Sequence, residues 1–423
     1  MSHSAPTPGP APTPAPAPAP AAESAEPSRN ETLLGEMLKS NWLVTVLAIV
    51  LALVISGVLI AAADETVQKS ATYLFARPGD FLSAAWHSGA NAYAALFQGS
   101  VFDGGAPPFA RAIKPITETM TVSVPLILAG LGLGIGFRAG MFNIGAQGQI
   151  VLGGVVGAYV GFTFNLPIGL HLLLAALGAA VGGGLWAGIA GFLKARTGAN
   201  EVIVTIMLNN IAIYLVGYLL TTKAFQRPGS NNPISPPVRS SALYPLLLGG
   251  QFRLHAGFLV AIAASVGVWW LMDRSTIGFR FRAVGANSKA ARTAGISVDM
   301  NYVWVMVVAG ALAGLAGSAQ VLGTEKVLDA GVAASFGFDA ITVALLGRSK
   351  PLGTFLAGLL FGALRAGGFT MQARTGTPID IVLVVQSLIV LFIAAPPLVR
   401  AVFRLSSPGL SRRARRTVEE VAA

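Results

Sequence analysis

The stretch FRAGMFNIGAQGQI, residues 137–150, separates two long apolar runs of the chain. Its Phe, Met and Ile side chains suit a membrane interior, but it also carries an arginine and the amides Asn143, Gln147 and Gln149. Polar side chains and irregular backbone occur at membrane depth only where they are buried in protein or line a water-filled cavity. The stretch therefore predicts a bundle of membrane-spanning segments that encloses polar groups.

The composition is typical of an integral membrane protein. Of the 423 residues, 54% are hydrophobic and 11% are charged, whereas soluble domains carry about 25% charged residues. The 50 glycines suit close packing of helices in lipid, where small residues let backbones approach. The absence of cysteine excludes disulfides, thiolate metal sites and cysteine nucleophiles. We expect an all-α polytopic membrane protein.

About ten transmembrane helices are expected, because roughly 20 apolar residues cross about 30 Å of hydrocarbon. The short loops on one side of these spans carry most of the arginines and lysines, as does the RRARR run at 412–416. Basic residues are retained in the cytoplasm, so we expect both termini to be cytoplasmic. The same retention accounts for the net charge of +11 without nucleic-acid binding. The expected spans lie near residues 42–63, 113–137, 147–165, 168–192, 203–221, 256–273, 300–322, 332–347, 351–370 and 381–399.

The two ends of the chain differ in composition from the apolar region between them. Residues 1–38 are rich in Pro and Ala, lack an apolar face and are expected to form a disordered cytoplasmic tail. They do not form a signal peptide, because no short apolar core with a small-residue cleavage site follows directly. Residues 406–423 are expected to form a basic cytoplasmic tail. The membrane domain is expected to occupy residues 39–405.

The loop between two expected spans, residues 274–299, contains the signal for a short helix. The sequence NSKAARTAGI, residues 287–296, has Asn287 or Ser288 as a candidate N-cap. Helix-forming residues follow, and Gly295 is a candidate stop. A plain connecting loop requires no such helix. We therefore expect a short cytoplasmic helix that transmits force from a cytoplasmic partner to the membrane domain.

Residues 278–323 have the sequence GFRFRAVGANSKAARTAGISVDMNYVWVMVVAGALAGLAGSAQVLG. This stretch looks like the cytoplasmic loop and following span of bacterial ABC-importer permeases of the ribose, galactose and nucleoside branch. FRAGMFNIGAQGQI resembles the hallmark stretch of the nucleoside-type members, and GANEVIVTIMLNNIAIYLVGYLL, residues 198–220, is similar to the same subgroup. The Pro-rich N-terminus has no counterpart in the family core.

The resemblance implies that residues 39–405 form a permease domain within an assembly of several chains. A second permease chain, related or identical, would complete the membrane part, and a cytoplasmic ABC ATPase would drive it. An extracytoplasmic solute-binding protein would deliver a small-molecule solute. The short helix in the 274–299 loop would be the coupling helix that docks on the ATPase. The residues assigned to this coupling are Gly285, Asn287, Ala290, Ala291 and Gly295.

The residues themselves also point to a separate ATPase. A phosphate-binding loop requires G-x-x-x-x-G-K-[ST], and the chain contains no Gly-Lys dipeptide. The four histidines are scattered, and no metal cluster or Ser/His/Asp set is visible. We expect no catalytic residue, no metal site and no cofactor in this chain, and no nucleic-acid partner.

Amides in two places are candidates for lining a solute pathway. Asn143 and Gln147 would share a face if both lay in one α-helix, because they stand at i and i+4. Asn209 and Asn210 fall near the middle of the 203–221 span. Amides both donate and accept hydrogen bonds, so they recognise a neutral solute without the desolvation cost of a charge. The alternative, which we favour for Asn143 and Gln147, is structural hydrogen bonding between helices.

Asp339 and Arg365 lie within adjacent expected spans. A charge at the centre of a membrane helix costs on the order of 2.5–3.5 kcal/mol on insertion scales. We predict that the two side chains form a partly buried structural ion pair. The alternative is that Arg365 snorkels to the outer membrane surface.

These observations favour a permease subunit that translocates nucleosides inward across a bacterial plasma membrane. The resemblance of residues 137–150 favours nucleosides, and the same assembly importing simple sugars such as ribose or galactose is the alternative. An ion-coupled secondary transporter is less favoured, because Asp339 is the only carboxylate clearly inside a span. A membrane scaffold would need neither amides in mid-span nor a cytoplasmic helix framed by glycines.

Overall fold

The computed structural model describes residues 41–105 and 108–404, and regular secondary structure there is helical apart from one isolated β-bridge. The all-α prediction is confirmed for this part of the chain. The tails predicted at 1–38 and 406–423 lie outside the described residues. Residues 44–399 form one compact unit. The elements are α2 (Asn41–Ala63), α3 (Glu65–Ala71), α4 (Pro78–Ser100), α5 (Phe109–Ala112), α6 (Lys114–Arg138), α7 (Ala146–Thr163), α8 (Leu170–Thr197), α9 (Glu201–Leu219), η1 (Ser240–Ala242), α10 (Gly257–Arg274), α11 (Thr276–Ala286), α12 (Ser288–Thr293), α13 (Val298–Ser318), η2 (Ala319–Thr324), α14 (Phe336–Leu346), α15 (Pro351–Thr375), α16 (Asp380–Ala394) and α17 (Pro396–Val402).

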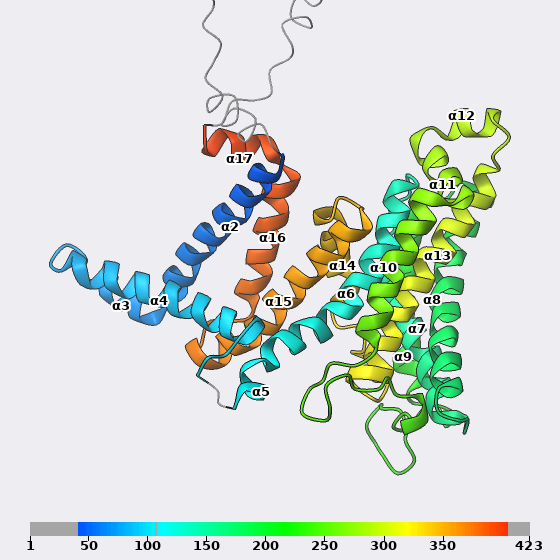
Figure 1. Cartoon of the computed structure of the whole chain (residues 1–423), viewed down its shortest axis with the longest axis horizontal. Helices are drawn as coiled ribbons and strands as arrows, with labels where there is room; N and C mark the ends of the chain where they lie inside the picture. The colour runs from blue at the N-terminus through cyan, green and yellow to red at the C-terminus, as the bar shows by residue number, and fades with distance from the viewer. Residues whose placement is uncertain (1–40, 106–107, 405–423) are drawn as a thin grey trace, which may run out of the picture. The chain divides into compact units, whose positions relative to one another are not determined.

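Helix α6 is central to the 44–399 unit. Every residue from Ser123 to Gly136 is buried, because α10, α13, α14 and α15 all pack against this helix (Figure 1). Small residues make the approach close. A Cβ atom on Gly132 would lie 2.5 Å from the carbonyl oxygen of Ala309 in α13. Such backbone contact is the way helices associate in lipid, where no hydrophobic force drives them together.

Helices α7, α8 and α13 pack in the same manner. A Cβ atom on Gly314 of α13 would lie 2.1 Å from the carbonyl oxygen of Ala179 in α8. One on Gly153 of α7 would lie 2.4 Å from the Cα atom of Gly314. A larger side chain at Gly314 would therefore push α13 away from α8, and one at Gly153 would push α7 away from α13. The glycines thus allow α7, α8 and α13 to pack backbone against backbone, with no room for side chains between them.

Seven described helices are long and apolar enough to cross a membrane, or eight if the bent pair α16 and α17 counts as one span. The chain is therefore a multi-pass membrane protein, but the predicted count of ten spans is not confirmed. Helix α7, in the third expected span, is 18 residues long and is not among the seven. Its first turn carries two glutamines, which lower its hydropathy.

The span predicted at 332–347 is wrong as a full crossing. Residues 325–335 are not helical, and α14 is an apolar helix of 11 residues. The preceding segment is held by a distant loop: the Leu328 amide donates to Ser235 Oγ at 2.8 Å, and the Ser235 amide donates to the Leu328 carbonyl at 3.0 Å. These tertiary bonds keep the backbone out of a helix that the apolar pattern alone would extend.

The span predicted at 381–399 is broken near its end. Proline has no N–H group and disfavours helical backbone at the residue before it. Pro396 follows Ala395 at this point, and the segments 380–393 and 396–402 meet at 92°. A straight crossing over the whole predicted range is therefore corrected to a helix of 15 residues followed by a bent short helix.

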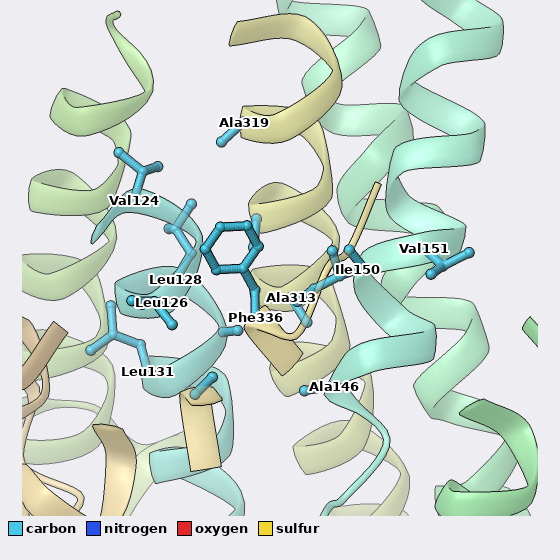
Figure 2. Packing of buried hydrophobic residues seen from close by; sticks show 14 of the residues in the cluster. Val124, Leu126, Leu128, Leu131, Ala146, Ile150, Val151, Ala313, Ala319 and Phe336 are labelled. Atoms are coloured by element: carbon cyan, nitrogen blue, oxygen red, sulfur yellow. The ribbon is translucent and has the colours of Figure 1, made fainter. Parts of the chain in front are cut away.

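Helix α13 does not end at Ser318 but continues as the π-helical turn η2. Residues 319–323 of this turn are buried. Phe336, the first residue of α14, lies close by, and its ring points between Val124 and Leu128 of α6 on one side and Ile150 of α7 on the other (Figure 2). Because π-helical turns occur frequently at functional sites, η2 directs attention to the polar groups around it.

Candidate functional site

The stretch at 141–144 is not helical, and α7 begins at Ala146. Asn143 and Gln147 therefore do not share a helical face, and that prediction is wrong. Asn143 instead pairs with Gln149: its Nδ2 donates to Gln149 Oε1 at 3.2 Å, and Gln149 Nε2 donates to Asn143 Oδ1 at 3.1 Å. The Asn143 Oδ1 atom also accepts from the Gly145 amide at 2.8 Å, so the pair closes the turn into α7. Both side chains are 1% exposed.

Gln147 joins the first turn of α7 to the first turn of α14. Its Nε2 donates to the Ala334 carbonyl at 2.6 Å, and its Oε1 accepts from the Gly337 amide at 2.9 Å. The helices touch here, since a Cβ atom on Gly337 would lie 2.3 Å from the Gln147 backbone nitrogen. One glutamine thus satisfies backbone groups at the start of a short helix that would otherwise lack partners.

Asn209 ties α9 to the same place. Its Oδ1 accepts from the Gly148 amide at 2.8 Å, and its Nδ2 donates to the Ile144 carbonyl at 2.9 Å. Asn210 lies on another face of α9, is exposed, and donates to the Ile206 carbonyl in its own helix. We call the four buried amide side chains the amide crossing. They are Asn143, Gln147, Gln149 and Asn209.

Two further α9 side chains satisfy the backbone of the non-helical stretch. The Phe142 amide donates to Glu201 Oε1 at 3.4 Å, and the Ile144 amide donates to Thr205 Oγ1 at 3.3 Å. Glu201 also pairs with Lys194 of α8 at 2.5 Å. Buried backbone groups need such partners. The amide crossing and these α9 contacts therefore make irregular backbone stable inside an apolar bundle.

Arg365 of α15 lies against the start of α14. Its Nη1 donates to Asp339 Oδ2 at 2.9 Å and to Ser335 Oγ at 3.1 Å, and its guanidinium lies 4.2 Å from the centre of the Phe336 ring. Ser335 Oγ in turn donates to Asp339 Oδ2 at 2.8 Å. The predicted partners are thus in contact, with both side chains more than three-quarters buried. The carboxylate offsets the arginine charge, and a cation over an aromatic face is further stabilised.

A cavity of about 350 Å³ opens beside this pair. We call it the Arg365 cavity. It lies among α6, η2, the 325–335 loop, α14 and α15, next to the amide crossing, because Ala334 both lines it and accepts the Gln147 hydrogen bond. Its polar and aromatic lining comprises Thr121, Arg253, Gln320, Thr324, Glu325, Asp329, Phe336, Arg365 and Phe369.

The sequence reasoning missed Gln320, Asp329 and Phe369 as site residues. Gln320 falls inside the span expected at 300–322, and Asp329 lies between that span and the one expected at 332–347. The available signal was the polar run TEKVLD, residues 324–329, directly after a long apolar segment. Such a run marks the point where a helix ends before its expected partner begins.

The short helix predicted in the 274–299 loop is present as α12. Asn287 Oδ1 caps it by accepting from the amides of Lys289 and Ala290 at 3.0 and 3.1 Å. Gly295 follows with φ +79°, a left-handed conformation that glycine adopts without strain. Ala291 is buried against Val284 and Val298, while Asn287, Ala290 and Gly295 are exposed. The helix therefore presents an open outer surface on a small apolar base.

The 274–299 loop touches the 137–150 stretch directly. A Cβ atom on Gly285 would lie 2.4 Å from the Arg138 carbonyl oxygen, so α11 meets this backbone without room for a side chain. Arg138 also pairs with Asp273 at 2.7 Å. A movement of α11 and α12 would therefore reach the chain segment that leads into the amide crossing.

Comparison with known proteins places the chain among transport permeases. Residues 116–394 match the family model described as "Branched-chain amino acid transport system / permease component". Over 317 residues the chain is 38% identical to the guanosine ABC transporter permease protein NupP of Bacillus subtilis (strain 168), covering 75% of this chain and 88% of that protein.

Two further relatives differ in the solute that their names give. The glucose ABC transporter permease protein TsgB13 of Haloferax volcanii is 39% identical over 287 residues, covering 66% of this chain and 75% of that protein. The nucleoside ABC transporter permease protein NupB of Lactococcus lactis subsp. cremoris is 33% identical over 290 residues, covering 66% and 79%. No solved structure matches the chain.

Proposed function

This chain belongs to the family of branched-chain amino acid transport permease components, and we propose that it carries nucleosides through the membrane as one subunit of an ABC importer. Like its permease relatives, it is a transport component and not an enzyme. The observation that carries the proposal is the similarity to the guanosine permease, which covers 88% of that protein. The nucleoside permease supports the same solute class.

The proposed assembly contains partners that this chain does not supply. ATP hydrolysis belongs to a separate cytoplasmic ATPase, a second permease chain completes the membrane part, and a solute-binding protein outside the membrane delivers the solute. In this orientation both termini and the 274–299 loop are cytoplasmic, and the membrane is the plasma membrane of a bacterium. The absence of a Gly-Lys dipeptide supports a separate ATPase, because a phosphate-binding loop needs that lysine.

The geometry suggests how ATPase movement reaches the membrane domain. The exposed surface of α12, around Ala290, docks on the ATPase, and its apolar base transfers the movement to α11. Gly285 of α11 then presses on the backbone at Arg138. That backbone leads into the amide crossing, whose hydrogen bonds fix the first turns of α7 and α14. We propose that Asn143, Gln147 and Asn209 position the pathway walls, and that Asn210 lines the pathway on the open face of α9.

Import of simple sugars is the second candidate. The glucose permease among the relatives supports it, at an identity similar to that of the guanosine permease. Both solute classes are neutral and rich in hydroxyl groups, so both suit a site of paired charges and amides. What separates them is the aromatic base of a nucleoside.

Uptake by intact cells tests the proposal. Radiolabelled guanosine and ribose would be supplied to cells that lack this gene and to the same cells with the gene restored. We expect loss and recovery of guanosine uptake, with ribose uptake unchanged. Loss of ribose uptake alone would keep the importer and replace its solute. No change in either would contradict the proposed function.

A further inference from the structure

The Arg365 cavity contains polar groups that the protein does not satisfy. The Asp329 Oδ1 atom is buried and has no hydrogen-bond partner among the described residues. The Gln320 residue is 5% exposed, and its side chain makes no hydrogen bond to any residue in the described ranges. Buried polar atoms without partners are uncommon in proteins, and each costs about 1–3 kcal/mol. The buried Asp329 oxygen and the unbonded Gln320 amide line the same cavity, so both are available to a ligand there.

The local backbone explains how these groups come to line a cavity. In η2 the change from α- to π-helix alters the direction of successive side chains, so Gln320 faces the cavity rather than a neighbouring helix. The Glu325 amide closes the turn on the Gln320 carbonyl at 2.8 Å. Asp329 follows the Leu328–Ser235 contact, which fixes its loop. Both groups are therefore held in place by the fold before any ligand binds.

The charges around the cavity favour a neutral ligand. Both arginines in its lining have carboxylate partners, since Arg365 pairs with Asp339 at 2.9 Å and Arg253 lies 3.5 Å from Glu118. The two carboxylates of the lining form no ion pair within the described residues. An anionic solute such as a phosphate ester would meet unpaired negative charge and no unpaired cation. Burial of an unpaired charge is costly, so a neutral solute is preferred.

The remaining lining is aromatic. The side chain of Phe369 on α15 is 57% exposed and borders the cavity. Phe336 also lines the cavity, with its ring 4.2 Å from the Arg365 guanidinium. A flat ring stacked on an exposed aromatic side chain contributes about 1–3 kcal/mol. A sugar has no such ring, so Phe369 is the feature that separates a nucleoside from a simple sugar.

Resting on the proposed function, we propose that the Arg365 cavity binds the solute in this chain and recognises a ribonucleoside by two features. The base stacks on Phe369, and a hydrogen-bond donor of the base or ribose reaches Asp329 Oδ1. An ionised carboxylate only accepts hydrogen bonds, so it requires an N–H or O–H group from the solute. Gln320 both donates and accepts, and it contacts whichever polar edge lies next to η2.

The test uses the complete importer in cells that lack the native gene and express either the wild type or a variant. Uptake of radiolabelled guanosine is measured over a range of concentrations for wild type, Asp329→Leu and Phe369→Ala. Inosine, 2′-deoxyguanosine and 3′-deoxyguanosine, each lacking one donor, are measured alongside. Asp80→Leu and Phe97→Ala are matched controls, because both residues are exposed on α4 outside the cavity. Delivery by the solute-binding protein is the same for every variant, so differences report on this chain.

We expect Phe369→Ala to raise the KM for guanosine about tenfold, as loss of one stacking contact predicts. Wild type should prefer guanosine about tenfold over the analogue that lacks the donor to Asp329, and Asp329→Leu, which has no acceptor atom, should abolish that preference alone. If both variants keep the KM values and the analogue ratios of wild type, the cavity assignment is overturned. The proposed function still stands in that case, provided that wild type imports guanosine. No guanosine import by wild type would overturn both.

Discussion

The amide crossing and the Arg365 cavity are neighbouring polar regions that differ in where their hydrogen bonds go. In the crossing, Gln147 is bonded at both ends of its amide, to Ala334 and Gly337. In the cavity, Gln320 is equally buried, and its side chain has no partner among the described residues. The two glutamines are therefore buried to a similar extent but differ in their hydrogen bonding. Gln147 bonds to other parts of the helix bundle, whereas the Gln320 side chain is free to bond to a solute.

A polar residue in a membrane segment can therefore have one of two roles. A fully bonded amide holds helices together, and its removal leaves buried partners without bonds. An unbonded amide contributes little to the fold, because no protein group depends on it. Variants of the amide crossing should therefore lower stability more than transport, and variants of the Arg365 cavity should lower transport more than stability.

The tightest contact in the crossing is that between Gly337 and the first turn of α7. Gly337→Ala would place a Cβ atom 2.3 Å from the Gln147 backbone, so two helix starts must separate. We expect a loss of about 3 kcal/mol or more in stability, measured as the thermal midpoint of purified protein in detergent. Gly217→Ala is the control, because nothing lies within 4 Å of the added atom. Equal midpoints for the two variants would contradict the close contact.

The ion pair borders both regions. Asp339→Ala leaves the partly buried Arg365 without its carboxylate partner. We expect the free energy of unfolding to fall by about 3 kcal/mol and solute uptake to be lost. Exchange of the two residues, Asp339→Arg with Arg365→Asp, should restore part of the uptake that either single change abolishes. Glu65→Ala is the control, because it removes an exposed pair with Lys69 worth at most about 0.5 kcal/mol. Failure of the exchange to rescue would count against pairing.

Gln147 itself should be a stabilising residue. Gln147→Leu removes two hydrogen bonds and leaves the Gly337 amide buried without a partner. We expect a lower thermal midpoint, equivalent to about 2 kcal/mol. Asn210→Leu is the matched control, because that exposed amide bonds only within its own helix. A midpoint unchanged by Gln147→Leu would mean that the crossing does not hold the bundle.

His255 lies between Thr324 of the cavity lining, whose Oγ1 is 3.4 Å from its Nε2, and the start of α10, and it should make stability depend on pH. Its Nδ1 accepts from the Gly257 amide at 3.1 Å, and the residue is 1% exposed. Burial, with a smaller contribution from the Arg253 charge, lowers the pKa of His255 to about 4. The unfolded chain binds the proton first, so stability present at neutral pH is lost as the pH falls from about 6.5 toward about 4.

The size of this effect is open to direct measurement. Between about pH 7 and about pH 5.5 we expect His255 to account for about 1 kcal/mol of lost stability. His255→Gln should flatten the pH dependence of the thermal midpoint, whereas His87→Gln, at an exposed histidine of α4, should not. The same slope in wild type and His255→Gln would exclude His255 as its source.

Sequence patterns predicted the elements whose causes are local. The cap at Asn287 and the stop at Gly295 follow from side-chain chemistry within a few residues, and both were found. The all-α multi-pass architecture follows from hydropathy, which is summed along each segment. The Asp339–Arg365 contact was accessible too, because opposite charges in adjacent apolar segments have few other partners.

What the sequence did not predict depends on contacts between distant residues. The orientation of the Asn143 side chain was not predicted, because Asn143 precedes α7, which begins at Ala146. Side chains of α9 bond to the backbone before Ala146 and keep it from forming a helix. The length of α14 was missed because the segment before it is bonded to Ser235. Gln320 was missed because a π-helical turn departs from the 3.6-residue period on which helix patterns rest.

The most direct measurement compares Gln147→Leu with Gln320→Leu in one experiment. For each variant, the thermal midpoint of the purified protein and the KM for guanosine uptake, corrected for the amount of protein in the membrane, would be determined together. We predict a crossed result: Gln147→Leu lowers the midpoint and keeps the KM, whereas Gln320→Leu keeps the midpoint and raises the KM. The same pattern in both variants would contradict the division of polar residues into those that hold the bundle and those that contact the solute.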